Sequence, residues 1–231
     1  MSEARKPGGY ASPPCMAQEV NPAYFDPLST DQEQARDVAR WRKATREFLR
    51  TERDMLSVSD RQEISRALSD RLGSFLQGRF GGATGRVLSA YWPIKGEPDL
   101  RPLLADLHAD GVIIALPVVE TRAAPLVFRR WTPETQMVRG DWNIPVPPQE
   151  ADRLSPDIAL APVIGWTDDC FRLGYGGGYF DRTLAVLSPQ PPTIGIGLST
   201  ARLKTIYPQP HDIPLDFILT ETGLCAERNK S

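Results

Sequence analysis

The chain has 231 residues, of which 41% are hydrophobic and 24% are charged, and this balance excludes a wholly disordered protein. The formal net charge of −2 provides no positive field, so we expect no nucleic-acid partner. Three scattered cysteines and two histidines support neither a disulfide framework nor a structural zinc site. No apolar run approaches the ~18–20 residues of a membrane helix, and we therefore expect a cytoplasmic protein that does not bind membranes.

Residues 1–28 are predicted to form a flexible leader. The segment contains five prolines and a Gly-Gly pair, and no apolar periodicity runs through it. It offers too little apolar surface to offset the entropy lost on ordering, although a remnant of an expression vector is an alternative origin. The expected organisation is this leader, a folded α/β domain over residues 29–225 and a short polar tail over residues 226–231.

Two helices are predicted to follow the leader. The segment Thr30–Glu33 has the pattern of a capping box, and apolar residues then recur at helical spacing as far as Met55. The segment Ser59–Gln62 is the predicted cap of the second helix, which should end at Gly81-Gly82. A helical unit is therefore expected ahead of the rest of the domain.

Short strands that alternate with helices are predicted after residue 82. The predicted strands cover residues 87–92, 112–116, 126–131, 157–164, 193–198 and 216–220, and the predicted helices cover residues 100–108 and 178–187. This alternation is typical of a mainly parallel sheet that is covered by helices on both faces. The expected fold is a single α/β domain with a central, mainly parallel sheet in a Rossmann-like three-layer arrangement, preceded by the N-terminal helices.

The most unusual segment is Arg172–Arg182, which we call the glycine loop. Four glycines in five positions allow the backbone to approach a ligand closely, and the following helix N-terminus favours a phosphate. Arg172 adds a positive charge, and Asp181 suits Mg²⁺, which is usually bound through one or two carboxylates and phosphate oxygens. The segment matches neither a dinucleotide-binding fingerprint nor a Walker A loop, and a loop that only turns a corner is the alternative.

Four blocks in this order resemble the 5-formyltetrahydrofolate cyclo-ligase family, also called 5,10-methenyltetrahydrofolate synthetase. They are Tyr91–Glu97, Trp142–Pro147, the glycine loop, and Pro210–Asp216 followed by Thr220-Glu221. The resemblance covers roughly residues 31–222. It implies that the protein, as a monomer, uses ATP and Mg²⁺ to close 5-formyltetrahydrofolate, with or without a polyglutamate tail, to 5,10-methenyltetrahydrofolate. ADP and phosphate are released, and phosphorylation turns the formyl oxygen into a good leaving group.

The resemblance also implies the residues of the site. ATP would contact Arg42 and Lys43 in the first helix. The glycine-loop residues that it assigns to ATP are Arg172, Leu173, Gly174, Tyr175, Gly176, Gly177, Gly178, Tyr179 and Phe180. Those that would also face the folate are Tyr175, Gly176, Gly177, Gly178 and Tyr179, together with Trp92, Glu97 and Trp142. The implied Mg²⁺ ligands are Asp181 and Asp212, and the implied catalytic residues are Arg172, Tyr179 and Glu97.

Some of these residues also have an ordinary structural explanation. Asp212 is suited to a turn ahead of Pro214, and Glu97 to a turn before Pro98. Trp142 offers an aromatic face for stacking, but a buried core tryptophan is the alternative. These alternatives stay open at the level of the sequence.

The first helix departs from the family pattern at one position. The family's lysine four residues before Arg42 is Val38 in this chain, which removes one implied phosphate contact, and Arg40 or Lys43 is the expected replacement. The departure favours an alternative function, that of a non-catalytic folate- or nucleotide-binding relative that buffers or senses its ligand. The presence of Glu97 and of both aspartates favours the enzyme.

Deleting residues 1–28 is expected to leave the melting temperature and the activity nearly unchanged, because the segment has little apolar surface to contribute. Thermal melts and assays of the full-length and truncated proteins test this. A loss of several degrees would show instead that the leader packs on the domain, with Tyr24 and Phe25 as the candidate contacts.

Overall fold

The computed structural model describes residues 32–229. The predicted leader, Thr30 and Asp31 of the first predicted cap, and residues 230–231 lie outside the described residues. The chain divides into a unit that ends at Arg40 and a unit that begins at Trp41, and the division falls within helix α2 (Gln32–Asp54). The fold and the site below belong to the second unit. None of the helices described is long and apolar enough to cross a membrane.

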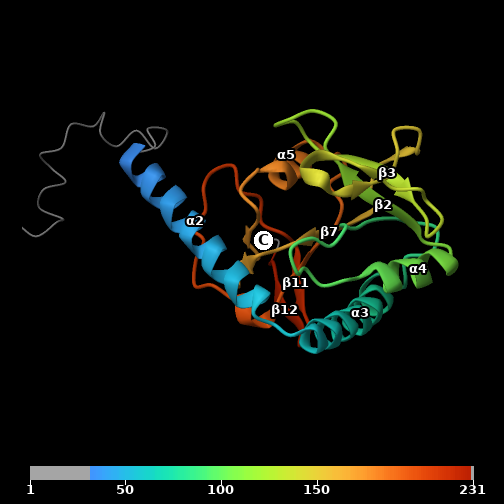
Figure 1. The fold of residues 1–231 in the computed structure, drawn as a ribbon, viewed down its shortest axis with the longest axis horizontal. Helices are drawn as coiled ribbons and strands as arrows, with labels where there is room; N and C mark the ends of the chain where they lie inside the picture. The colour runs from blue at the N-terminus through green and yellow to red at the C-terminus, as the bar shows by residue number, and fades with distance from the viewer. Residues whose placement is uncertain (1–31, 230–231) are drawn as a thin grey trace, which may run out of the picture. The chain divides into compact units, whose positions relative to one another are not determined.

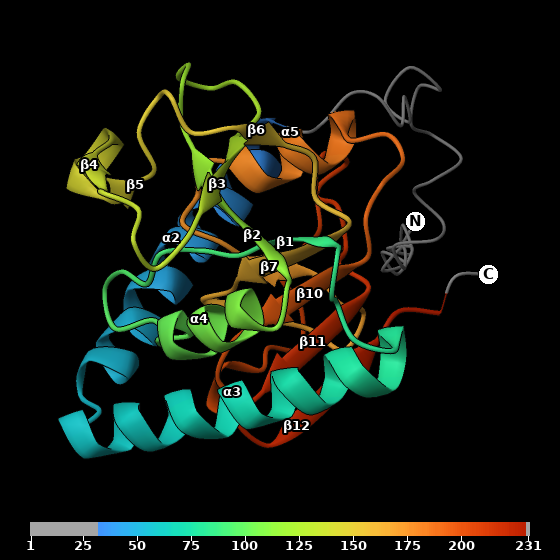
Figure 2. The same ribbon diagram turned by 90° about the vertical axis from the view of Figure 1, so that its right-hand side faces the viewer.

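The described part of the second unit is built around a central sheet (Figure 1). Its eight strands, which Figure 2 labels, have the order β12-β11-β10-β7-β1-β2-β3-β6. The strands are β1 (Val87–Ser89), β2 (Ile113–Val118), β3 (Val127–Trp131), β6 (Arg153–Leu154), β7 (Ile158–Pro162), β10 (Thr193–Ile196), β11 (Phe217–Thr220) and β12 (Gly223–Glu227). The five strands from β11 to β2 pair in parallel, and β12, β3 and β6 are added by antiparallel pairing. The prediction of a mainly parallel sheet is therefore confirmed.

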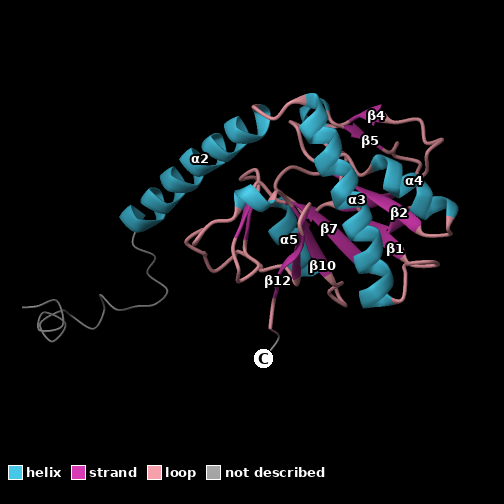
Figure 3. Ribbon diagram, turned by 90° about the horizontal axis from the view of Figure 1, so that it is seen from below, coloured by secondary structure: helices cyan, strands magenta, loops and turns pink. Residues whose placement is uncertain are grey.

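Helices cover both faces of this sheet. Helices α3 (Val58–Phe80) and α4 (Arg101–Ala109) lie on one side, and α5 (Tyr179–Val186) lies on the other (Figures 2 and 3). Successive residues of a strand point to opposite faces. Leu160 of β7 accordingly joins the core beneath α3, whereas Ala161 joins the core beneath α5. Both sides of the central strands are buried, which confirms the three-layer prediction.

Two features differ from the sequence-based expectations. Helix α3 is capped by Ser57, not Ser59: the Ser57 hydroxyl accepts the backbone N–H of Asp60, and the Asp60 carboxylate accepts the N–H of Ser57. The helix therefore begins two residues before the predicted cap residue would allow. Strand β12 extends to Glu227, so the first residues of the predicted polar tail pair with β11. The predicted end at Gly81 is confirmed, because Gly81 is the left-handed C-cap.

Two small hairpins were not anticipated from the sequence. One pairs β4 (Val138–Arg139) with β5 (Pro145–Val146) around the short helix η2 (Asp141–Asn143). The other pairs β8 (Gly165–Trp166) with β9 (Arg172–Leu173) and leads into the glycine loop. Two-residue strands are too short to show a periodic pattern. A further short helix, η3 (Ser199–Ala201), follows β10.

Replacing Leu72 with alanine should destabilise the fold by about 2–5 kcal/mol, because Leu72 is fully buried between α3 and the sheet and its loss leaves a cavity. Val58→Ala on the same helix is the control, since the Val58 side chain is 72% exposed and its truncation should change stability by less than about 0.5 kcal/mol. Urea unfolding measures both variants. Equal effects would contradict the packing described for α3.

Candidate active site

A cavity of about 860 Å³ opens at the carboxyl ends of the parallel strands. Its walls include residues that follow β1, the end of β2 and the end of β7. Strands β1 and β7 are neighbours, but the chain leaves β1 for α4 on one face and later passes from β7 to α5 on the other. Connections that diverge from adjacent parallel strands leave a crevice, which is where α/β sheets bind ligands.

The glycine loop forms one wall of this cavity. All nine residues from Arg172 to Phe180 line it. Gly176 and Gly178 have φ angles of 93° and 63°, and Gly178 is the N-cap of α5. A residue with a side chain is strained in this left-handed region, which accounts for glycine at both positions. The loop is held from α2, because Arg46 donates a 2.6 Å hydrogen bond from Nε to the carbonyl oxygen of Gly174.

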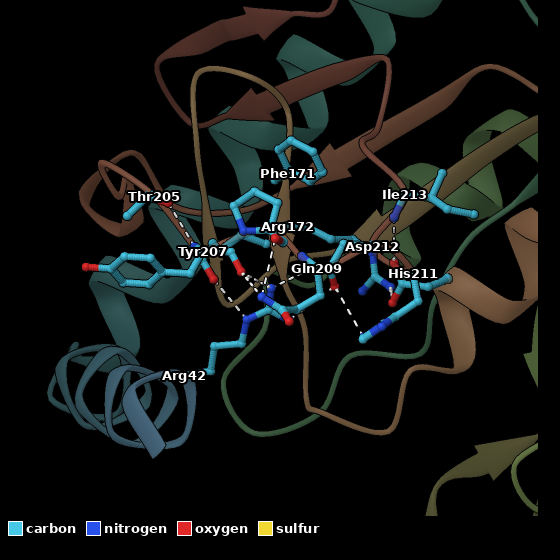
Figure 4. A network of polar contacts seen from close by, with 12 residues as sticks. Arg42, Phe171, Arg172, Thr205, Tyr207, Gln209, His211, Asp212 and Ile213 are labelled. Carbon is cyan, nitrogen blue, oxygen red and sulfur yellow. Dashed lines mark hydrogen bonds and ion pairs between the residues drawn. The ribbon is translucent and has the colours of Figure 1, made fainter. Parts of the chain in front are cut away.

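Both predicted metal ligands line the cavity, and each is paired with an arginine. Arg172 donates to Asp181 at 2.7 Å, and Arg42 donates to both carboxylate oxygens of Asp212 (Figure 4). Burial alone would raise the pKa of Asp212, but the hydrogen bonds from Arg42 and from the backbone N–H of Gln209 outweigh it and lower that pKa. Asp212 is therefore held in the ionised form that a cation requires.

The two aspartates fit a magnesium ion that also binds phosphate. Residues 32–229 contain no cluster of three or more histidine, cysteine, aspartate or glutamate side chains that could cage a metal. Mg²⁺ bound with a nucleotide does not need one, since phosphates and waters complete its octahedron. Oδ1 of Asp181 accepts only a long 3.4 Å hydrogen bond from Ile213, and Oδ1 of Asp212 accepts one bond of 3.1 Å. Each aspartate thus retains an oxygen with a free lone pair.

Arg42 is mainly occupied by protein groups. Besides Asp212, its guanidinium donates to the carbonyl oxygens of Ile206 and Tyr207, at 2.9 Å each (Figure 4). Four of its five N–H groups are thereby used, and the residue is only 9% exposed. Arg42 therefore fastens the segment from Ile206 to Asp212 to α2 and keeps one N–H for a ligand.

Glu97 is more than a turn residue, because it lines the cavity and is hydrogen-bonded to the glycine loop. Its Oε2 accepts the backbone N–H of Ile94 at 2.9 Å, and its Oε1 accepts the Tyr175 hydroxyl at 2.8 Å. Burial raises the pKa of Glu97 despite these bonds and the nearby cations. Burial also raises the pKa of Tyr175, so its hydroxyl keeps its proton and donates.

Aromatic side chains complete this end of the cavity. Trp92 and Trp142 both line it, and Trp142 meets Tyr179 edge to face with ring centroids 5.6 Å apart. The Trp142 side chain is 68% exposed, which excludes the alternative of a buried core tryptophan. Its ring is therefore accessible to a flat ligand.

The structure brings together all of the predicted site residues except one. Lys43 is exposed and does not line the cavity, because one step along a helix turns a side chain by about 100°. Arg46 and Arg50 also line the cavity, although they were not among the predicted site residues. Their spacing in the sequence could have indicated this, because Arg42, Arg46 and Arg50 recur every four residues and so share one helix face.

Comparisons with known proteins agree with this geometry. The model of the 5-formyltetrahydrofolate cyclo-ligase family matches residues 38–221. A relative of that name from Mycolicibacterium smegmatis is 29% identical over 182 residues, covering 74% of this chain and 93% of the relative. One from Mycoplasma pneumoniae is 27% identical and covers 78% and 98%. The solved 5,10-methenyltetrahydrofolate synthetase of Aquifex aeolicus superposes with a TM-score of 0.69 at 26% identity, covering 82% of this chain and 94% of that one.

Replacing Arg42 with methionine should destabilise the protein at neutral pH, because the largely buried Asp212 loses its partner. The lowered pKa of Asp212 gives stability that is present above about pH 4, the pKa of an ordinary aspartate, and is lost as the pH falls. The difference in unfolding free energy between wild type and variant should therefore narrow below about pH 4.

Urea unfolding at neutral and acid pH measures this difference. Arg202→Met is the matched control, since it breaks a pair with Asp168 in which both side chains are about 60% exposed and should matter far less. If the difference in unfolding free energy between wild type and Arg42→Met did not change with pH, Arg42 would not stabilise the fold through Asp212.

Proposed function

The chain belongs to the 5-formyltetrahydrofolate cyclo-ligase family, as its four sequence blocks predicted, and we propose on that basis that it catalyses the ATP-dependent closure of 5-formyltetrahydrofolate to 5,10-methenyltetrahydrofolate. The observation that carries the proposal is a single cavity that joins a glycine-rich, arginine-lined end to an end with two tryptophans and a glutamate. A nucleotide phosphate and a pterin ring need these two kinds of surface side by side.

At the phosphate end, the protein would bind ATP through backbone N–H groups and arginines. The loop from Arg172 to Phe180 leads into the N-terminus of α5, where free N–H groups favour an anion. Arg46 and Arg50 face the same space from α2, and the buried Nε of Arg50 has no hydrogen-bond partner. We propose that these two arginines supply the phosphate contact that Val38 cannot make.

Asp181 and Asp212 would hold the magnesium ion at this end. When bound, Mg²⁺ supplies positive charge that offsets the charge developing on the transferred phosphoryl group. Arg172, which is now paired with Asp181, lies within reach of the same phosphate oxygens. Because only 8% of its side chain is exposed and its guanidinium lies 4.9 Å from the ring of Phe180, it would provide a fixed cation that needs little rearrangement.

At the folate end, Glu97 would accept N–H groups of the pterin, and the rings of Trp92, Trp142 and Tyr179 would cover its faces. Held in this way, the formyl oxygen attacks the γ-phosphorus of ATP and ADP leaves. N10 of the folate then attacks the activated carbon, its proton passes to solvent, and phosphate departs with the former formyl oxygen. Catalysis in this scheme is largely positioning and charge neutralisation.

The decisive experiment mixes the purified protein with ATP, Mg²⁺ and 5-formyltetrahydrofolate and follows the long-wavelength absorbance of the methenyl product. Product that depends on all three components supports the proposal. Binding of both ligands without product would favour the second candidate, a non-catalytic relative that buffers or senses its ligand, which the substitution at Val38 motivates. Failure to bind either ligand would exclude both functions.

Gly178→Ala should weaken ATP binding strongly while costing only about 1–2 kcal/mol of stability, the cost of a left-handed conformation for a residue with a side chain. Gly178 lines the cavity, and a Cβ there would meet, at 2.8 Å, Nη1 of Arg182, whose Nη2 donates to the Gly177 carbonyl oxygen of the loop. Calorimetric titration of Mg²⁺–ATP measures the affinity, and urea unfolding measures the stability.

Gly81→Ala is the matched control. Gly81 has nearly the same φ, 66° against 63°, but a Cβ there meets nothing within 4 Å and the residue lies away from the cavity. It should lose the same stability and keep wild-type behaviour toward ATP. If Gly178→Ala also keeps wild-type affinity, the glycine loop does not bind the phosphates.

A further inference from the structure

Arg53, Tyr175 and Glu97 form a hydrogen-bonded chain through one wall of the cavity. Nη2 of Arg53 donates to the Tyr175 hydroxyl at 3.0 Å, and that hydroxyl donates to Oε1 of Glu97 at 2.8 Å. The three residues come from α2, from the glycine loop and from the segment after β1. Tyr175 and Glu97 line the cavity, whereas Arg53 stands behind them.

Arg53 is a buried cation with few partners. It is only 5% exposed, and its Nε has no hydrogen-bond partner. Burying a guanidinium is costly unless an opposite charge is near. The carboxylate that interacts electrostatically with Arg53 is that of Glu97, one hydroxyl away. We therefore expect Arg53 to orient Glu97 and not to add much to the stability of the fold.

The chain leaves Glu97 little freedom. The Tyr175 hydroxyl has one proton, and because it accepts from Arg53 that proton is directed at Glu97. The other carboxylate oxygen is held by the N–H of Ile94. Both oxygens are thereby fixed, and the lone pairs that remain are available to a ligand in the cavity.

We infer that Arg53 is a positioning residue, which acts through Tyr175 to hold the Glu97 carboxylate aimed at the folate. The inference rests on the proposed function, because it takes Glu97 as the acceptor of the pterin N–H groups. The sequence argument assigned Arg53 no role, and the residue does not touch the cavity. Through Arg53, a residue of α2 that lies behind the cavity wall takes part in the proposed folate site.

The charges around Glu97 set the expected pH dependence. Arg53 faces it from α2, Lys95 from its own segment, and the hydroxyls of Tyr91 and Tyr175 from the residues just after β1 and from the glycine loop. Burial raises the pKa of Glu97, and the two cations oppose that rise. Lys95 is exposed to water, which screens its charge. Removing Arg53 should therefore raise the pKa of Glu97 further.

The test compares the binding of 5-formyltetrahydrofolate to wild-type protein and to Arg53→Met, without ATP, over a range of pH. The variant should bind about tenfold more weakly at neutral pH, as expected for loss of a charge-assisted contact. Its affinity should recover as the pH rises, because Glu97 then ionises without help. Arg53→Lys should restore part of the affinity at neutral pH. Arg36→Met, an exposed arginine of the same helix, should behave like wild type.

A double-mutant cycle tests whether the effect passes through Tyr175. Tyr175→Phe removes the linking hydroxyl, and the double variant with Arg53→Met should bind no more weakly than the weaker single variant. Effects that simply add would overturn the chain. Circular dichroism shows whether Arg53→Met folds. If it does not, Tyr175→Phe and Arg53→Lys provide the test, since both must shift the pH dependence of 5-formyltetrahydrofolate binding to higher pH.

The outcomes separate this inference from the proposed function. Wild-type protein that does not bind 5-formyltetrahydrofolate would contradict the proposed function itself. Wild-type binding together with unchanged affinity and pH profile in Arg53→Met would leave the function standing and overturn the role of Arg53.

Discussion

The hydrogen bonds of Arg42 hold one side of the cavity together. A single guanidinium joins α2 to two backbone carbonyls and to the Asp212 carboxylate. The segment that it holds precedes β11 and carries no regular structure of its own, so its backbone polar groups depend on such partners. Arg42 and Asp212 are both well shielded from solvent, which makes the pair costly to break. The placement of Asp212 beside the glycine loop follows from this contact.

The C-terminal half of α2 spreads four arginines along the site. Arg42, Arg46, Arg50 and Arg53 are separated by four, four and three residues, a spacing that keeps them on one helix face. Their tasks nevertheless differ, because each meets a different segment. Arg42 binds the loop before β11, Arg46 binds the glycine loop, and Arg53 binds Tyr175. The helix thus acts as a common support for the two ends of the cavity.

The sequence predicted the sheet and the ligand-bearing segments better than it predicted the helix face. Buried parallel strands such as β7 are continuous apolar runs, and glycine-rich loops are rare enough to be conspicuous. The arginines of α2 were harder to assign, because a run of cations on a helix is usually a solvated face. Only the packed structure shows which side is inward, and it turned Lys43 outward while it buried Arg53. The cap at Ser57 was missed for a similar reason, since the segment around it contains two serines before Asp60 with comparable capping potential.

Each aspartate of the cavity is paired with an arginine, so a charged ligand can enter only by replacing one ionic partner with another. Arg172 and Asp181 neutralise one another, as do Arg42 and Asp212. Under the proposed function, a nucleotide without its metal would compete with two aspartates for these arginines. A nucleotide that carries a divalent cation would instead offer each aspartate a new partner, so no carboxylate would be left unpaired. The site would therefore favour metal-bound over bare nucleotide before any chemistry begins.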